Sequence, residues 1–420
     1  MRLRGRAVRL SLSLAALLTL SGCWDRTEVN DIAIVQGIAL DSGGHGQIEV
    51  TVSIAIPAQV TPPGATGGSG EQGPPASNRA ATARTVTEAM NFLQEKLSRR
   101  LFFAHNAVIL IGEELAKEGV NPHMDFFARH RQNRLRTPIA VVAGRAADVL
   151  ATTFPIELNV PVGIQEIERQ QLAPFTDLRR FLQALVSEGE EPFTAVVHVA
   201  TGGTAAPGTL RVPPDSAPEQ RDPSQPRVAG AAVFRGGHLA GLLNETEARG
   251  ILWARGELRT AITTVPLGDA NRWVGFELIR ASANLEPRVV DGRIVMRVGI
   301  KSEHDLVENP AGVDSASPKV IGLLEKALAR EIETNVRRAI DKVQKELASD
   351  VLGFGEQLRR VHPDVWTEVR ASWDELFPQV EVEVQVSAVV RRTGLAARPL
   401  SVRVEGLITY EELRTMLEGE

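Results

Sequence analysis

The chain of 420 residues contains a single cysteine, Cys23, and this excludes two covalent ways of holding small domains together. A lone thiol can form neither an internal disulfide nor a cysteine-based metal cluster. Apolar cores must therefore stabilise the fold. With 43% hydrophobic and 24% charged residues, the composition is typical of folded, water-soluble domains, and the length predicts two or three cores.

Cys23 closes an N-terminal segment with the features of an export signal. Four arginines come first, and an apolar run of 11 residues, 10–20, follows them. The run is too short to span a bilayer, which needs about 20 residues. It leads into Leu-Ser-Gly-Cys at residues 20–23, which resembles a lipobox, the site where bacteria attach a diacylglyceryl group to the cysteine sulfur and cleave before it. We therefore predict a lipoprotein signal peptide over residues 1–22 and a diacylglyceryl lipid on Cys23, with no other cofactor.

The net charge argues against one class of partner. Residues 1–22 hold four Arg and no acid, so their removal changes the formal net charge from −5 to −9. Binding to nucleic acid needs clustered positive charge, so we expect no nucleic-acid partner. No second apolar run of about 18 residues follows, so the lipid is the expected membrane anchor.

The first part of the mature chain alternates strand-like and helix-like patterns. Alternating apolar residues predict a hairpin from 32–40 and 48–56, and capping-box spacing predicts a helix over 86–99. Further elements are predicted along this stretch: strands at 107–111 and 139–142, and helices from 121 and near 146–152, 162–172 and 177–187. The order indicates an N-terminal α/β domain over 23–200, with a Pro/Gly-rich loop at 57–84.

A second Pro/Gly-rich stretch, residues 201–228, is interpreted as a linker or insertion. Beyond it we predict a middle domain over 229–286. Gly236-Gly237 indicates a hairpin there, and Asn244 with Glu247 indicates a capped helix that ends at Gly256.

The remaining residues, 287–420, are predicted to form a C-terminal α/β domain. Asp291-Gly292 indicates another hairpin, and a 3.6-residue apolar period indicates a long helix over 319–350. Valines alternate with polar residues over 380–386, which is typical of a strand with one buried face. The prediction as a whole is an α+β (mixed α/β) fold of three domains, each a β-sheet with flanking helices.

Motifs for catalysis are missing from the sequence: there is no nucleophile elbow, phosphate loop or zinc-protease motif. His123 and His130 could face one metal, but Asp125 is the only nearby acid, and a solvated face is the favoured interpretation. Glu381 and Glu383 are interpreted as the exposed side of a strand rather than a catalytic pair. We therefore expect neither an enzyme nor a metal site.

Four segments carry a resemblance to a known family, in the family's order. They are Cys23-Trp24-Asp25 running to Asp41, Ala104 to Ala116, Ala232 to Trp253, and Asp350 to Gly394. Together they resemble the C subunit of spore germination receptors, the Ger(x)C lipoprotein family. The segments cover most of the mature chain, and the two Pro/Gly-rich stretches look like insertions.

The resemblance implies three α/β-type domains on the outer face of the cytoplasmic membrane, which is the inner membrane of the spore. Such a subunit works beside an A subunit and a permease-like, multi-spanning B subunit to trigger germination by nutrients. The family supplies no ligand site, so Cys23 is the one functional residue, with Trp24 and Asp25 as motif companions. Three tryptophans are expected to fill cores: Trp253, Trp366 and Trp373. Two alternatives stay open, a lipid-anchored solute-binding protein that captures a small nutrient for a permease, and an envelope hydrolase.

Overall fold

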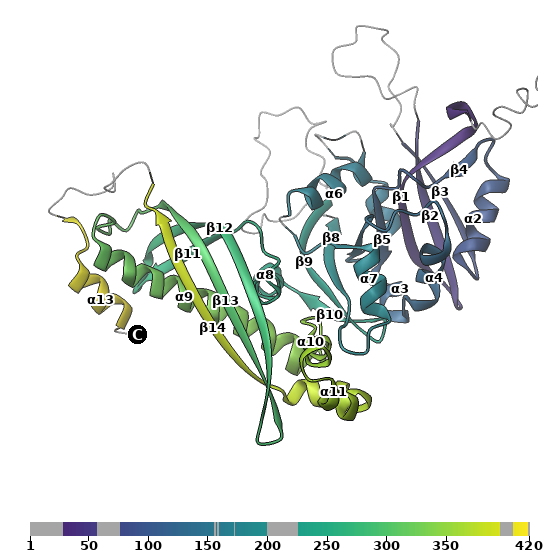
Figure 1. Cartoon of the computed structure of the whole chain (residues 1–420). Coiled ribbons are helices and arrows are strands. Elements are labelled where there is room, and N and C mark those ends of the chain that lie inside the picture. Colours follow the sequence, from purple (N-terminus) through teal and green to yellow (C-terminus); the bar gives the residue numbers. More distant parts are fainter. Residues whose placement is uncertain are drawn as a thin grey trace, which may run out of the picture.

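The computed structural model describes residues 28–56, 76–154, 157, 159–171, 173–199, 226–394 and 406–418. The described strands form two sheets, of ten and of four strands, at opposite ends of an elongated molecule (Figure 1). The predicted mixed α/β class, with helices flanking sheets, is confirmed. The predicted signal peptide, 1–22, lies outside the described residues.

The first sheet has the strand order β10-β9-β8-β6-β5-β1-β2-β3. Its main strands are β1 (Ile32–Gly44), β2 (Gln47–Ala55), β3 (Ala76–Ala83), β5 (Val108–Gly112), β6 (Pro138–Val142), β8 (Phe193–Val199), β9 (Pro226–Arg235) and β10 (His238–Leu243). Two short strands join it, β4 (Arg100–Phe102) beside β1 and β7 (Thr176–Asp177) beside β6. The central strands β1, β5, β6 and β8 run parallel, and every residue of β5 and β6 is buried, as expected for a sheet covered on both faces.

Helices cover both faces of this sheet. One set is α2 (Val86–Glu95), α3 (Glu113–Glu118), α4 (Asn121–Arg129) and α7 (Leu178–Leu185), and the other is α5 (Ala146–Leu150) and α6 (Val160–Arg169). The alternation along β5 shows how the faces divide. Ile109 and Ile111 pack with the first set of helices, whereas Val108 and Leu110 pack with the second.

The predicted loop 57–84 extends too far, because residues 76–83 form the edge strand β3. All eight of its residues pair with β2, from Ile48 opposite Ala83 to Ala55 opposite Ala76. The segment contains no large apolar residue, so no hydrophobic alternation marks it. Its backbone hydrogen bonds, rather than buried side chains, place it in the sheet.

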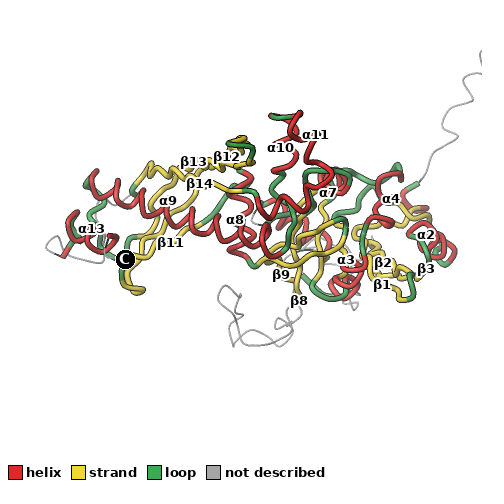
Figure 2. Tube along the Cα trace, turned by 90° about the horizontal axis from the view of Figure 1, so that it is seen from below, coloured by secondary structure: helices red, strands yellow, loops and turns green. Residues whose placement is uncertain are grey.

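The second sheet contains β11 (Ile262–Leu267), β12 (Asp269–Val290), β13 (Arg293–Glu308) and β14 (Glu381–Arg392), in that order. The long helix α9 (Pro318–Asp341) covers one of its faces, as Figure 2 shows from below. Asp291 and Gly292 both have positive φ at the turn between β12 and β13, which confirms the predicted hairpin. The predicted helix 319–350 ends before residue 350. α9 passes into a π-helical turn at Lys342–Glu346, and the helix cannot continue beyond Ala348 because that residue has a left-handed φ of 45°.

The expected middle domain, 229–286, is divided between the two sheets. β9 and β10 belong to the first sheet because β9 pairs with β8, and β11 and β12 belong to the second because β12 pairs with β13 along most of its length. Helix α8 (Glu245–Arg255) connects them, with the predicted capping box at Asn244 and the predicted end at Gly256. Three short helices lie between α9 and β14 in the sequence: α10 (Phe354–Val361), α11 (Pro363–Val369) and α12 (Trp373–Leu376).

The last described element is α13 (Tyr410–Glu418), which packs against α9. Across the described residues, no helix combines the length and the apolar character that crossing a bilayer requires.

Candidate functional site

The predicted anchor lies just ahead of the described residues, which begin at residue 28. Cys23, Trp24 and Asp25 therefore stay predictions. The first described element is a 3-10 turn, Val29–Asp31, which runs directly into β1.

Asp41, at the end of the first resemblance segment, has a structural role. Its carboxylate accepts hydrogen bonds from Ala146 N at 2.7 Å and Ala147 N at 2.9 Å, and so caps α5. The side chain is buried, and burial raises its pKa although both backbone bonds oppose the shift. Gly112 lies so close that an added Cβ would be 2.1 Å from Asp41 Oδ1.

Asp350, which opens the last resemblance segment, is also a buried cap. Its carboxylate accepts from Phe354 N at 2.9 Å, Gly355 N at 2.8 Å and Trp373 Nε1 at 3.0 Å. Burial raises the pKa of Asp350 to about 6, against the three hydrogen bonds that lower it. Trp373 in turn packs edge-on against Trp366, so these tryptophans fill the core as predicted. The motif therefore builds a helical corner.

This helical corner is joined to the first sheet by a contact that we call the junction, made by residues 189–191 and 349–356. Glu191 N donates to Asp350 O and Glu356 N donates to Gly189 O, both at 2.9 Å. An added Cβ on Gly189 would lie 2.5 Å from Glu356 N, so only glycine fits there.

Charged side chains surround the junction. Arg255 is nearly buried and pairs with Glu190 at 2.9 Å and Glu257 at 3.1 Å, while Arg180 reaches Glu257 at 2.5 Å. Burial raises the pKa of Glu191 to about 7, and its carboxylate accepts a hydrogen bond from Gly236 N. These groups hold the two sheets together.

No metal site is present in the described part of the chain, where no three His, Cys, Asp or Glu side chains converge. His123 and His130 are half-buried rather than fully solvated. The His130 ring stacks on Phe126 and meets Phe103 edge-on, and burial lowers the pKa of both histidines. His130 therefore packs against aromatic rings, contrary to the interpretation of a solvated face.

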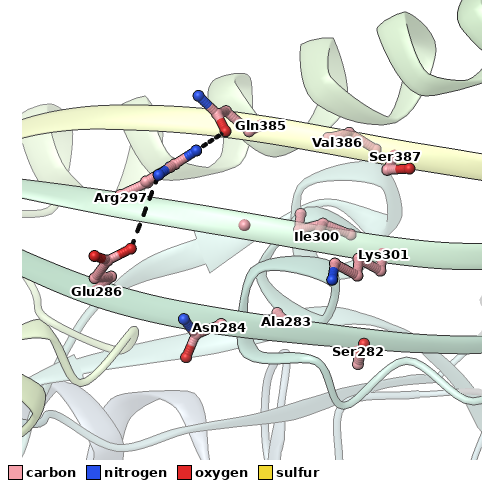
Figure 3. Close-up of a pocket in the computed structure, with 11 residues that line it drawn as sticks. Ser282, Ala283, Asn284, Glu286, Arg297, Ile300, Lys301, Gln385, Val386 and Ser387 are labelled. Atoms are coloured by element: carbon pink, nitrogen blue, oxygen red, sulfur yellow. Dashed lines mark hydrogen bonds and ion pairs between the residues drawn. The ribbon is translucent and has the colours of Figure 1, made fainter.

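The open face of the second sheet, opposite α9, carries a groove of about 450 Å³ lined by β12, β13 and β14 (Figure 3). Gly299 lies in the middle of it, between Asn284 on β12 and Gln385 on β14. An added Cβ at Gly299 would have one neighbour within 4 Å, the Asn284 carbonyl oxygen at 3.9 Å. The groove exists because this strand position lacks a side chain.

The groove has a different character at each end. Lys301 lies at one end, with Ser282 and Ser387 opposite it on the neighbouring strands. Arg297 lies at the other, where it donates to Gln385 and approaches Glu286 at 4.0 Å, as Figure 3 shows.

Charge and chemistry limit what this groove can do. Lys301 is exposed and forms no ion pair with any described residue, and the lining holds one more cation than anion. No His, Cys or Asp lines the groove, and its polar lining includes Ser282, Ser387, Lys301 and Glu286. It can hold a polar group. Glu381 and Glu383 stand exposed on the neighbouring strand, as predicted.

Sequence patterns did not reveal this groove. Its residues come from three strands and lie up to 105 positions apart in the sequence, and only the pairing register brings them together. The one local signal was a glycine with cations two residues to each side, Arg297 and Lys301, within an alternating strand.

Comparisons with known proteins cover nearly the whole described chain. Residues 25–199 match the family described as spore germination protein N-terminal domain, and residues 229–394 match the family described as spore germination B3/GerAC like, C-terminal. Spore germination protein KC of Bacillus subtilis (strain 168) is 27% identical over 402 residues, covering 93% of this chain and 96% of the relative.

Two further relatives agree with these matches. Spore germination protein B3 of the same organism is 23% identical over 397 residues, covering 93% of this chain and 99% of its own. The crystal structure of the GerBC protein has a TM-score of 0.54 and 20% sequence identity, and covers 87% of this chain and 99% of that one. The fold is therefore shared with the GerBC protein.

Proposed function

Because the chain belongs to the GerAC-type family of spore germination proteins, we propose that it is a lipid-anchored, non-enzymatic subunit of a nutrient germinant receptor that assembles with membrane-spanning partner subunits. The observation that carries the proposal is the extent of the family match. It covers both sheets, over 25–199 and 229–394, and begins two residues after Cys23. The matched relatives are named as spore germination proteins, and the matches cover almost their full length.

A lipid on Cys23 supplies the membrane attachment in this proposal. Each buried methylene contributes about 0.8 kcal/mol, so two acyl chains hold a protein at a bilayer stably, whereas one chain does not. The mature chain then stands on the outer face of the cytoplasmic membrane, the inner membrane of the spore. The A subunit and the permease-like B subunit are the proposed partners there.

A non-enzymatic role agrees with the sites described above. The buried carboxylates of Asp41 and Asp350 cap helices, and no His, Cys or Asp lines the groove at Gly299. The contribution of this chain is then to present surfaces to its partners rather than to turn over a substrate.

Fatty-acid labelling tests the attachment. Cells that produce the full chain are fed labelled palmitate, and the protein is isolated; the chain with Cys23 is expected to carry the label and Cys23→Ala to carry none. Trp24→Phe is the matched control, because it alters the next residue and leaves the thiol, and it should stay labelled. Equal labelling of Cys23→Ala would place the lipid elsewhere and contradict the proposal.

Copurification tests the assembly. The chain is isolated from detergent-extracted spore membranes, and we expect a multi-spanning subunit and an A-type subunit to accompany it. Recovery of the chain alone, from spores in which those subunits are present, would count against a receptor complex.

A second candidate function rests on the groove of the second sheet, namely capture of a small nutrient for a permease. Its polar lining and the unpaired Lys301 ammonium favour a small ligand with an anionic group. Calorimetry of the mature chain with single amino acids and simple sugars tests this. Micromolar binding that Lys301→Gln weakens, and that the exposed Lys326→Gln leaves unchanged, would favour capture over a purely structural subunit.

A further inference from the structure

Two stretches of the first sheet concentrate positive charge in a chain that is acidic overall. Residues 96–105 contain three Lys or Arg and no acid, and residues 129–137 contain four Arg and no acid. The whole chain has a net charge of −5. We call the seven cations of these stretches the basic edge: Lys96, Arg99, Arg100, Arg129, Arg131, Arg134 and Arg136.

The fold brings both stretches to the same edge of the sheet, where its parallel strands begin. Arg100 opens β4 and lies opposite Ile32, the first residue of β1. The second stretch precedes β6, and it contacts the segment after β4 because Gln132 Oε1 accepts a hydrogen bond from Phe103 N at 3.1 Å. The His130 ring also packs against Phe103, 5.2 Å away. Figure 1 shows β4 and α2 at the end of the molecule that is far from the second sheet.

The charges of the basic edge are available to a partner. All seven side chains are exposed. Arg129 pairs with Asp125 at 2.8 Å, whereas the other six form no ion pair within the described ranges. Many arginines elsewhere on the surface are instead paired with acids at (i,i+3) or (i,i+4) spacing, as Arg337 is with Glu333.

Exposed apolar side chains accompany the charges. Val29 is 66% exposed where the chain enters β1, and Leu135 is 48% exposed among the arginines of the second stretch. Cations interspersed with exposed apolar residues are typical of surfaces that lie against anionic lipid headgroups.

The position of the proposed anchor indicates that lipid binds to this surface. Five residues lie between Cys23 and Val29, and the six steps from one Cα to the next span at most about 20 Å when fully extended. A lipid on Cys23 therefore keeps the start of β1, and with it the basic edge, close to the bilayer. A tether of this length lets the exposed cations approach within about 10 Å of the bilayer, the distance over which the negative potential of anionic lipids decays.

We propose that the basic edge is a docking surface for anionic lipid headgroups, which sets the orientation of the chain on the membrane. The inference rests on the proposed function, because the anchor brings this edge to the bilayer. The second sheet then points away from the lipid, with its groove and its β12–β13 hairpin free to meet partner subunits.

Vesicle binding by an unlipidated protein tests this directly. The mature chain, 23–420, is produced with Cys23→Ser and mixed with vesicles of 30% phosphatidylglycerol in phosphatidylcholine, or of phosphatidylcholine alone, at 50 mM NaCl. Each cation near an anionic surface strengthens partitioning about fivefold. Arg131→Gln, Arg134→Gln and Arg136→Gln together should weaken cosedimentation with the anionic vesicles on the order of a hundredfold.

The matched control removes the same charge elsewhere. Arg249, Arg293 and Arg338 are exposed, form no described ion pair and lie outside the first sheet, so their combined change to Gln should leave binding within about twofold. Raising NaCl to 500 mM should release the unsubstituted chain, because salt screens the attraction.

Three results would overturn the inference. They are no preference for the anionic vesicles, equal loss in both triple variants, and binding that 500 mM NaCl leaves unchanged. A surface that instead binds an acidic protein would give the first of these. Because the tested chain carries no lipid, the outcome is independent of the anchor: an unmodified native Cys23 would refute the proposed function and leave the vesicle result standing.

Discussion

Gly189→Ala tests the junction between the two sheets. Gly189 lies where residues 189–191 meet the helical corner, and its carbonyl accepts a hydrogen bond from Glu356 N at 2.9 Å. An added Cβ would lie 2.5 Å from Glu356 N and 2.6 Å from the carbonyl carbon of Gly355, both backbone atoms. Ordinary contacts begin at 3.4 Å, so the two segments must separate by nearly 1 Å.

The expected cost follows from that displacement. Overpacking against rigid backbone costs about 1–3 kcal/mol, and loss of the Glu356–Gly189 hydrogen bond costs about 1 kcal/mol. Replacement of glycine stiffens the unfolded chain and returns about 0.5 kcal/mol. We therefore expect the free energy of unfolding to fall by about 2–3 kcal/mol.

Urea unfolding followed by tryptophan fluorescence measures this loss, because all four described tryptophans belong to the part of the chain around the second sheet. Gly322→Ala is the matched control. Nothing lies within 4 Å of an added Cβ at Gly322, the fifth residue of α9, so alanine should stabilise the chain by about 0.5–1 kcal/mol. A loss below about 0.5 kcal/mol for Gly189→Ala, or effects of the same sign at both sites, would refute the account of the junction.

Further predictions concern a cap and two buried titrating groups. Asn244→Ala removes the side-chain bond of the capping box of α8, which Asn244 Oδ1 accepts from Glu247 N, and should lower the free energy of unfolding by about 1 kcal/mol at neutral pH; no change in urea midpoint would count against it. The pKa of Glu191 is raised to about 7 in the fold, so the folded chain binds more protons than the unfolded chain between about pH 4.5 and 7, and stability falls as pH rises through that range. Glu191→Gln should remove this part of the pH dependence, about 3 kcal/mol at most, and an unaltered pH profile would disprove the assignment. Burial lowers the pKa of His304 to about 4, so the stability that the neutral ring contributes is complete above about pH 6.5 and is lost as pH falls toward 4. His304→Phe should therefore reduce the fall in the free energy of unfolding between pH 6.5 and 4 by up to about 3 kcal/mol, and an unchanged fall would show that another group titrates there.

Local signals in the sequence predicted the elements that local physics determines. Asp291-Gly292 marked its hairpin because both residues tolerate positive φ, and the Asn244 to Glu247 spacing marked the start of α8 because side chains at that spacing satisfy free backbone donors. The alternation at 380–386 likewise indicated β14.

Elements that depend on long-range pairing were predicted less well. β3 carries only small or polar residues, and pairing with β2 alone makes it a strand. The predicted middle domain, 229–286, is divided between the two sheets for a similar reason, since pairing partners rather than composition assign β9 to the first sheet and β12 to the second.

The candidate sites were also only partly predictable from the sequence. The motif acids Asp41 and Asp350 could be recognised from the sequence, but their role as buried caps depends on the distant segments that they contact. The basic edge was hidden by the acidic total, because an overall net charge says nothing about how charges are distributed over a surface. Pairing of β4 with β1 places the first stretch of the basic edge beside the start of β1.

The central claim, that a lipid on Cys23 attaches this chain to a membrane, is tested most directly by the mass of the N-terminal peptide of the protein isolated from its native membrane. The account predicts a mature chain that begins at Cys23 and carries the added mass of a diacylglyceryl group on its sulfur. A peptide that begins elsewhere, or a Cys23 with a free thiol, would contradict it.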